Sequence, residues 1–300
     1  MTERVTLETI INSTIASVQL SSLRMQKYQE KITTGKEINR ASDDPAGTRK
    51  VLSLRSEDLK LEQYSKNIVS SIQSLEFTTS TLNGAANFLQ RVQELAIQGV
   101  NGATDQEGRN AVASEINGIL ESMLQIANAS RSGRYIFAGT KTTTMPFEAT
   151  RNSAGEISGV TYNGNREKIR YPVGPGFSSQ VNQPGEEVFM DNNLLASLIS
   201  LRDNLANGAV SLASGNLGNV KNAYTDVTQF ISKGGAVASA LEFSDNRIKD
   251  TQVALQTTLG DLEGADLAEI VLKLKEQEGV LQAALASGMF MLNTSILDYM

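Results

Sequence analysis

Residues 54–96 read LRSEDLKLEQYSKNIVSSIQSLEFTTSTLNGAANFLQRVQELA, and every seventh residue of this stretch is apolar. The series is Leu54, Leu61, Ile68, Leu75, Leu82, Leu89 and Ala96. A narrow apolar stripe with a period of seven is typical of a helix that packs lengthwise against other helices. No proline lies between Pro45 and Pro146, so one long helix is predicted here.

Two further stripes repeat this pattern. One consists of Val112, Ile116, Ile119, Met123 and Ile126, and it follows a Thr104/Glu107 pair that predicts a helix-capping box. The other consists of Leu241, Ile248, Leu255 and Leu262. Three stripes in a chain with only 5% aromatic residues predict long helices bundled side by side. A large ordinary helical bundle is the alternative.

The middle of the chain has another character. Four of the five prolines lie between residues 146 and 184. The segments Ile157–Tyr162 and Lys168–Val173 flank Asn163-Gly164, a pair typical of a tight turn, and so predict a β-hairpin.

We therefore expect a mainly α fold with a β-rich insertion. Residues 1–42 and 261–300 would form a terminal coiled-coil domain that depends on assembly. Residues 43–135 and 191–260 would form a helical bundle domain, and residues 136–190 a small inserted outer domain.

Both ends of the chain carry amphipathic stripes, which we predict to be an assembly interface. Its residues are Ile11, Ile15, Val18, Met25, Ile32, Leu267, Leu274, Leu281, Leu285 and Leu292. Residues 1–40 have a net charge of +2 and residues 261–300 of −5, which favours pairing of the two ends. Burying the apolar side chains of either end recovers less free energy than ordering the segment costs, so both ends are expected to fold on assembly.

Composition excludes several classes of function. The chain has no Cys and no His, a net charge of −6 and no apolar run long enough to cross a membrane. We expect no nucleic-acid or membrane partner, no metal, no cofactor and no enzymatic activity. The N-terminus also lacks the pattern of a Sec signal.

Asp43-Asp44-Pro45 could be a metal or acid/base site, but it is more typical of a helix start. Asp261–Asp266 is best interpreted as a loop before the last helix.

The segment from Leu23 to Gly47, with Gly35-Lys-Glu-Ile-Asn-Arg40-Ala-Ser-Asp-Asp-Pro45 at its centre, resembles the flagellin superfamily. Gly133-Arg-Tyr-Ile-Phe-Ala-Gly139 and Asn182-Gln-Pro-Gly185-Glu-Glu-Val-Phe189 look like its hook-associated protein 3 branch. The ending Ser295-Ile-Leu-Asp-Tyr-Met300 is similar to the last residues of that branch.

This resemblance implies a structural subunit at the junction between hook and filament of the bacterial flagellum. Such proteins leave the cell through the flagellar type III export apparatus and form a ring. The implied partners are other copies of the chain, the other hook–filament junction protein, flagellin and a flagellar export chaperone. The resemblance implies that the chaperone covers the C-terminal amphipathic helix, here Leu274, Leu281, Leu285 and Leu292.

Two other interpretations remain open. A short flagellin would have similar ends but would polymerise into the filament itself. A cytoplasmic coiled-coil signalling or scaffold protein would account for the heptads but not for the β insertion.

Overall fold

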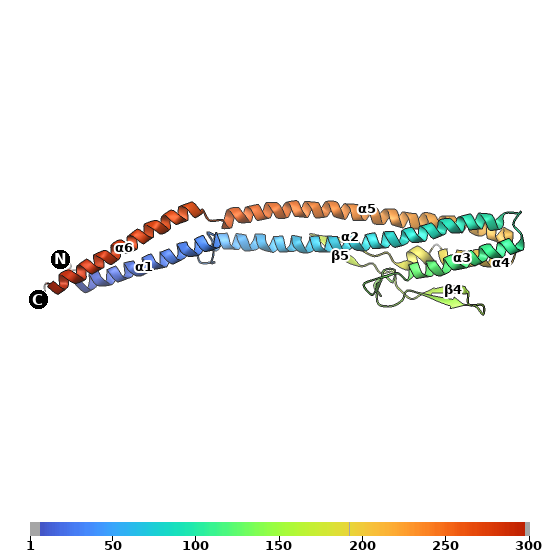
Figure 1. Ribbon diagram of the computed structural model, residues 1–300, viewed down its shortest axis with the longest axis horizontal. Helices are drawn as coiled ribbons and strands as arrows, with labels where there is room; N and C mark the ends of the chain where they lie inside the picture. Colours follow the sequence, from blue (N-terminus) through green and yellow to red (C-terminus); the bar gives the residue numbers. More distant parts are fainter. Residues whose placement is uncertain (1–6, 192, 298–300) are drawn as a thin grey trace. The chain divides into compact units, whose positions relative to one another are not determined.

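The computed structural model describes residues 7–191 and 193–297, with side chains for all of these except 7, 8, 10 and 291–297. Its long helices confirm the predicted mainly α fold with a central insertion of short strands (Figure 1). The α-helices are α1 (Leu7–Thr34), α2 (Pro45–Val100), α3 (Gln106–Ala127), α4 (Leu194–Ala206), α5 (Val210–Glu263) and α6 (Leu267–Leu297).

The chain divides into two compact units. The first unit contains the described residues up to Lys60 and those from Asp250 onwards; the second contains Leu61–Lys249. The long helices α2 and α5 continue from one unit into the other. Whether residues 136–190 fold as a domain of their own stays a prediction.

The heptad stripe of α2 forms one side of the core of the second unit. Ile68, Leu82 and Leu89 are fully or almost fully buried. Ile68 packs in one cluster with Leu241 and Ile248 of α5, the residues of the late stripe. Both stripes are therefore confirmed as helix faces that pack against other helices.

The capping box predicted at Thr104 is wrong by one residue. Asp105 is the N-cap of α3, and its carboxylate accepts a hydrogen bond of 2.8 Å from the backbone N–H of Gly108. The hydroxyl of Thr104 donates to the carbonyl of Gln98 instead, which closes the turn after α2.

A buried carboxylate joins α2 to α5 in the second unit. Asp245, 6% exposed, accepts hydrogen bonds from the Ser65 hydroxyl at 2.5 Å and from the Lys249 ammonium at 2.6 Å. Burial alone would raise the pKa of Asp245, but the bonds from Lys249 and Ser65 outweigh it and hold the pKa below its ordinary value. The ionised form is therefore the one that stabilises the fold.

Asp245→Asn is expected to lower the free energy of unfolding by about 1 kcal/mol at pH 7. Because the folded pKa is the lower one, the contribution is complete above the unfolded pKa of about 3.9 and is lost as pH falls through the folded pKa. Urea unfolding at pH 7 and pH 3 measures this, and the difference between wild type and variant should shrink at pH 3. Glu242→Gln, at an exposed position of the same helix, is the control. A difference that persists at pH 3 would contradict the assignment.

Three aromatic rings form the centre of the second unit. Phe189 meets Phe137 and Phe147 edge-on, with ring centroids 5.2 and 5.4 Å apart, and all three rings are fully buried. They belong to one apolar cluster that also contains residues of α2, α3, α4 and α5. A side chain at Gly185 would collide with Phe147, at 2.7 Å, so the turn before Phe189 requires glycine. Glu186–Met190 follows it as a short π-helix, η1.

The strands form three separate antiparallel pairs. The pairs are β1 (Ser130–Arg131) with β2 (Arg134–Tyr135), β3 (Phe147–Arg151) with β4 (Ile157–Tyr162), and β5 (Arg170–Gly174) with β6 (Phe177–Gln180). The predicted hairpin across Asn163-Gly164 is therefore wrong, because β4 and β5 each pair with another strand. The hydroxyl of Tyr162 lies 2.9 Å from the carbonyl oxygens of Phe137 and Asn165, so the segment after β4 packs against this ring rather than reversing.

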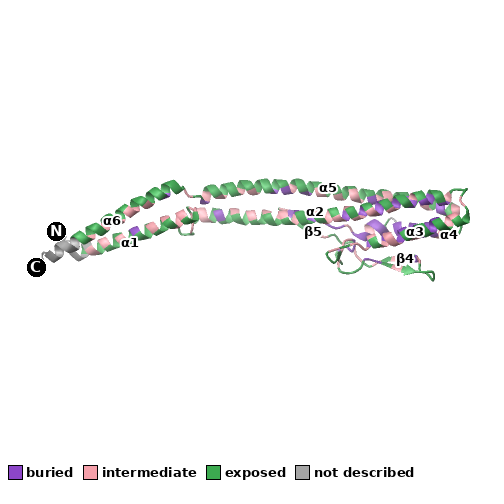
Figure 2. Ribbon diagram, viewed as in Figure 1, coloured by how far each residue is buried: buried purple, intermediate pink, exposed green. Residues whose placement is uncertain are grey.

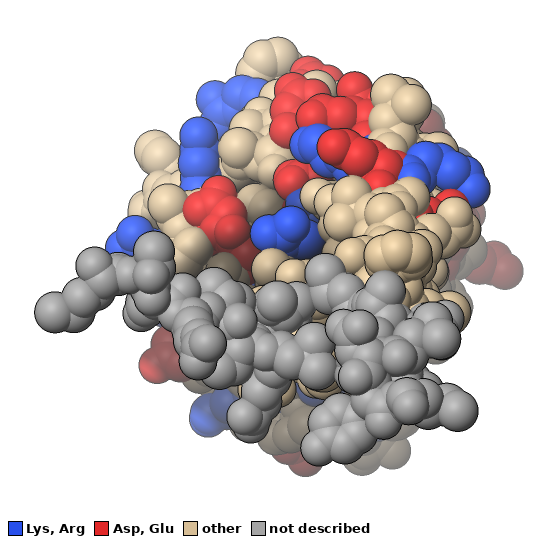
Figure 3. Space-filling model, turned by 90° about the vertical axis from the view of Figure 1, so that its left-hand side faces the viewer, with Lys and Arg blue, Asp and Glu red and all other residues tan. Residues whose placement is uncertain are grey.

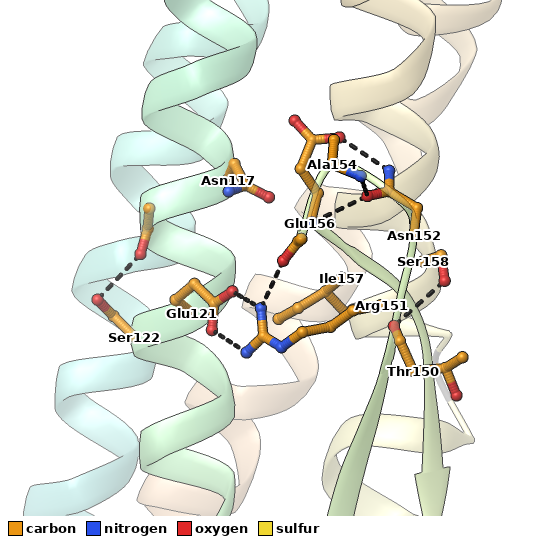
Figure 4. Close-up of polar contacts among 12 residues, drawn as sticks. Asn117, Glu121, Ser122, Thr150, Arg151, Asn152, Ala154, Glu156, Ile157 and Ser158 are labelled. Atoms are coloured by element: carbon orange, nitrogen blue, oxygen red, sulfur yellow. Dashed lines mark hydrogen bonds and ion pairs between the residues drawn. The ribbon is translucent and has the colours of Figure 1, made fainter.

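Polar contacts hold the β3–β4 pair against α3 (Figure 4). The guanidinium of Arg151 donates to both carboxylate oxygens of Glu121, at 2.5 and 2.9 Å, and to the carbonyl of Gly155. Arg202 of α4, 3% exposed, donates to the carbonyl of Ile157 at 2.8 Å. These contacts fix the strands to the helices in the second unit.

Candidate assembly surface

Helices α1 and α6 of the first unit pack against each other along a narrow seam. Their less exposed side chains recur three and four residues apart, as in a coiled coil. On α1 these are Ile11, Thr14, Val18, Ser21, Met25, Tyr28 and Ile32; on α6 they are Ile270, Leu274, Gln277, Leu281, Ala284 and Gly288. A side chain at Gly288 would lie 3.3 Å from Thr14, so the two faces touch closely.

The seam buries little. Among the described residues of these helices, only Ser21 and Ile270 are buried. The buried Oε1 atom of Gln277 has no hydrogen-bond partner among the described residues, which weakens the seam further. Figure 2 shows the difference from the second unit, whose helices carry many more buried residues. The pair has too small a core to be held by its own packing.

A second set of apolar side chains on both helices is exposed. Seven of the α6 residues and three of the α1 residues belong to it, with exposed fractions from 43 to 71%. They are Ile15, Leu20 and Leu23 on α1 and Leu267, Val271, Leu272, Val280, Leu285, Met289 and Phe290 on α6. We call these residues the open face. Apolar residues this dense on two paired helices are typical of a surface that another protein covers.

The structure separates the residues predicted to form the interface. Six lie half-buried on the seam: Ile11, Val18, Met25, Ile32, Leu274 and Leu281. Ile15, Leu267 and Leu285 belong to the open face, and the side chain of Leu292 is outside the described residues. The other seven open-face residues were not predicted as interface residues, and their apolar character was the available signal; they are Leu20, Leu23, Val271, Leu272, Val280, Met289 and Phe290. The role of all these residues in assembly stays a prediction.

The opposite charges of the two ends are not used across the seam. Apart from Lys36–Glu263 beside the inner end of the seam, the ion pairs between described residues of these segments run within one helix, or from a helix to the loop at its end. Examples are Glu269–Lys273 within α6 and Lys27–Asp43 from α1 to the following loop. In the end-on view of Figure 3, acidic side chains gather on the upper part of the surface, with basic ones beside and between them. Apolar and small side chains, rather than ion pairs, form this seam.

A network of contacts connects the break between α1 and α2 to the break between α5 and α6. The N–H of Glu37 donates to the carbonyl of Glu263 at 2.7 Å, and the N–H of Ala265 donates to the carbonyl of Gly35 at 3.1 Å. The Glu263 carboxylate also receives Lys36 at 3.0 Å and Arg55 at 2.7 Å. We call this group the clasp; it consists of Gly35, Lys36, Glu37, Arg55, Glu263, Gly264 and Ala265.

Glu263 is the charged centre of the clasp. Its side chain is only 12% exposed. Burial would raise the pKa of Glu263, but hydrogen bonds from Lys36 and Arg55 outweigh burial and keep the pKa below its ordinary value. The carboxylate is therefore ionised at neutral pH. It binds Lys36 of the loop between α1 and α2, and Arg55 of α2.

The first acidic motif is a helix start. The carboxylate of Asp44 accepts from the N–H of Ala46 at 3.0 Å, and Pro45 is the first residue of α2. The loop predicted at Asp261–Asp266 is wrong for its first half, because α5 continues to Glu263 and only residues 264–266 connect it to α6. Asp266 accepts from the N–H groups of Ala268 and Glu269 at the start of α6. Within the described part of the chain, no three Asp or Glu side chains are placed to hold a metal ion. None of the described helices is both long and apolar enough to cross a membrane.

Comparison with known proteins shows which family these helices belong to. Residues 7–142 match the bacterial flagellin N-terminal helical region, and residues 217–299 match the bacterial flagellin C-terminal helical region. The chain belongs to the flagellin family. The matched regions contain α1, α6, the clasp and all of the open face, so the surface described above is built from the parts that define this family.

Individual relatives differ in how much of this flagellin-family chain they match. Flagellar hook-associated protein 3 of Escherichia coli K12 is 26% identical over 88% of this chain and 89% of its own length. The flagellin of Clostridium tyrobutyricum is 31% identical but over only 40% of this chain and 32% of its own. A solved structure of a putative flagellar hook-associated protein from Vibrio parahaemolyticus shares the fold, with a TM-score of 0.66, 20% identity, and coverage of 74% of this chain and 100% of that one.

Proposed function

We propose that this chain is a structural subunit of the bacterial flagellum that forms the junction between hook and filament. The observation that carries the proposal is the match to a hook-associated protein 3 along nearly the full length of both chains. At 88% of the chain that match spans the central strands and η1, whereas the flagellin of Clostridium tyrobutyricum matches only 40% of the chain. The proposed activity is assembly, with no catalytic, cofactor or metal role.

The terminal helices support assembly as the mechanism. One copy leaves the open face uncovered and its seam poorly packed, so neighbouring copies in a ring would supply the missing apolar contacts. The other hook–filament junction protein and flagellin would cover the ends of such a ring. Terminal helices held this weakly also suit a chain that leaves the cell unfolded by type III export and pairs its ends afterwards.

The chaperone proposal becomes more specific in the structure. Leu274 and Leu281 lie on the seam against α1, whereas Leu285 lies on the open face. A chaperone that covers all three must take the place of α1 on α6. Binding of a flagellar export chaperone and pairing of α1 with α6 would then exclude each other, which keeps the chain from assembling before export.

A short flagellin is the alternative function, since a flagellar filament core protein of Treponema maltophilum is 25% identical over 82% of this chain and 87% of its own length. Electron microscopy of a strain that lacks this chain distinguishes the two. A junction subunit predicts hooks that end without filaments, and filament protein shed into the medium. The purified chain, seeded with filament fragments, should not extend them. Long filaments grown from the purified chain would establish the flagellin function instead.

A further inference from the structure

The ends of α1 and α6 that meet at the clasp come from opposite ends of the sequence. α1 ends at Thr34 and α6 begins at Leu267, so the helices near both ends of the chain are interrupted at the clasp. Lys36 and Gly264 form an antiparallel bridge between the two breaks. This bridge aligns the first turn of α6 with the last turn of α1, so it sets the register of the whole seam.

The clasp has further contacts on both of its sides. On the side of α2 and α5, Val51 is buried, and the amide of Gln252 donates to Asp58 at 3.1 Å. On the other side lies the seam of α1 and α6, with its two buried residues among those described. The clasp thus lies between these contacts of α2 with α5 and the seam of α1 with α6.

The loop between α1 and α2 is itself tied down. Arg40 pairs with Glu30 at 3.2 Å, Lys31 pairs with Glu37, and Lys27 reaches Asp43 at 3.4 Å. These pairs fold the loop back onto the last turns of α1. The loop is therefore fixed relative to α1, and its residue Lys36 contacts Glu263.

We propose that the clasp is the starting point from which α1 and α6 pair, and that it forms before the seam and independently of it. Bringing two segments together from opposite ends of a long chain costs closure entropy, and a clasp that already joins them removes most of that cost. The pairing then needs only to extend outward, turn by turn, in the register that the bridge imposes. The consequence for assembly rests on the proposed function, in which neighbouring copies complete the pairing.

Hydrogen exchange of the full-length single chain tests the order of formation. The N–H groups of Glu37 and Ala265 donate the two backbone bonds of the clasp, so they should exchange more slowly than the seam amides of α1 and α6. Seam amides as slow as those of the clasp, or slower, would overturn the proposal. This measurement needs no flagellum, so its result is independent of the proposed function.

Glu263→Gln removes the charge that both cations bind. Exchange at Glu37 and Ala265 should become roughly tenfold faster, and the amount of chain on isolated flagella should fall by a similar factor. The matched control is Glu269→Gln, which removes an exposed ion pair within α6 at 2.6 Å and should change neither quantity. Normal incorporation of Glu263→Gln would overturn the proposal. Absence of the wild-type chain from flagella would instead contradict the proposed function and leave the exchange result standing.

Discussion

Leu281→Asp is expected to reduce the amount of chain on isolated flagella by about tenfold or more. Leu281 lies half-buried on the seam, at the level where α1 presents Ser21, the one buried residue among the described side chains of that helix. A carboxylate there is partly desolvated, which costs about 1–3 kcal/mol, and each 1.4 kcal/mol corresponds to roughly a factor of ten. Immunoblots of sheared flagella, of the medium and of whole cells measure the effect and separate assembly from export.

The neighbouring residue provides a matched control for this variant. Gln282→Asp adds the same charge to the same turn of α6, but at an exposed position off the seam. It should incorporate within about twofold of wild type, as surface substitutions usually have small effects. Equal loss in both variants would show that added negative charge, rather than the seam, is responsible. Neither variant should alter the unfolding of residues 61–249, which form the other compact unit.

Phe189→Ala is expected to lower the free energy of unfolding of the second unit by about 3–5 kcal/mol. The ring is fully buried and meets two other buried rings edge-on, so its removal leaves a cavity that the surrounding helices cannot fill. Urea unfolding followed by circular dichroism measures the loss. Phe177→Ala removes the same side chain from a position that is 75% exposed and should cost less than about 0.5 kcal/mol. Similar losses in the two variants would contradict the burial.

The same experiment tests the predicted inserted domain. Phe189 and Phe137 lie in residues 136–190, yet they share one apolar cluster with Leu120 of α3 and Leu198 of α4. A shared cluster predicts that strands and helices of the second unit lose structure in a single transition. An early transition in Phe189→Ala that leaves the helical signal intact would support an independent domain at 136–190.

Sequence patterns were sufficient to predict those parts of the structure that depend on residues close together in the sequence. The heptad series through Ile68 and Leu82 predicted the buried face of α2, because a helix places every seventh residue on nearly the same side. Asp44-Pro45 predicted the start of α2, because both residues act within one turn. The hairpin at Asn163-Gly164 failed because a turn signal does not determine which strands pair; β4 pairs with β3, and β5 pairs with β6.

The sequence by itself determined that this chain consists of long helices with incompletely buried ends, and its motifs placed it in the flagellin family. Only the tertiary structure decided which end residues form the seam and which remain open, since Leu281 and Leu285 are both apolar and differ only in what packs against them. It also brought Glu263 to Lys36 and Arg55. Contacts between residues so far apart in sequence depend on how the chain folds back on itself, and no local pattern records that.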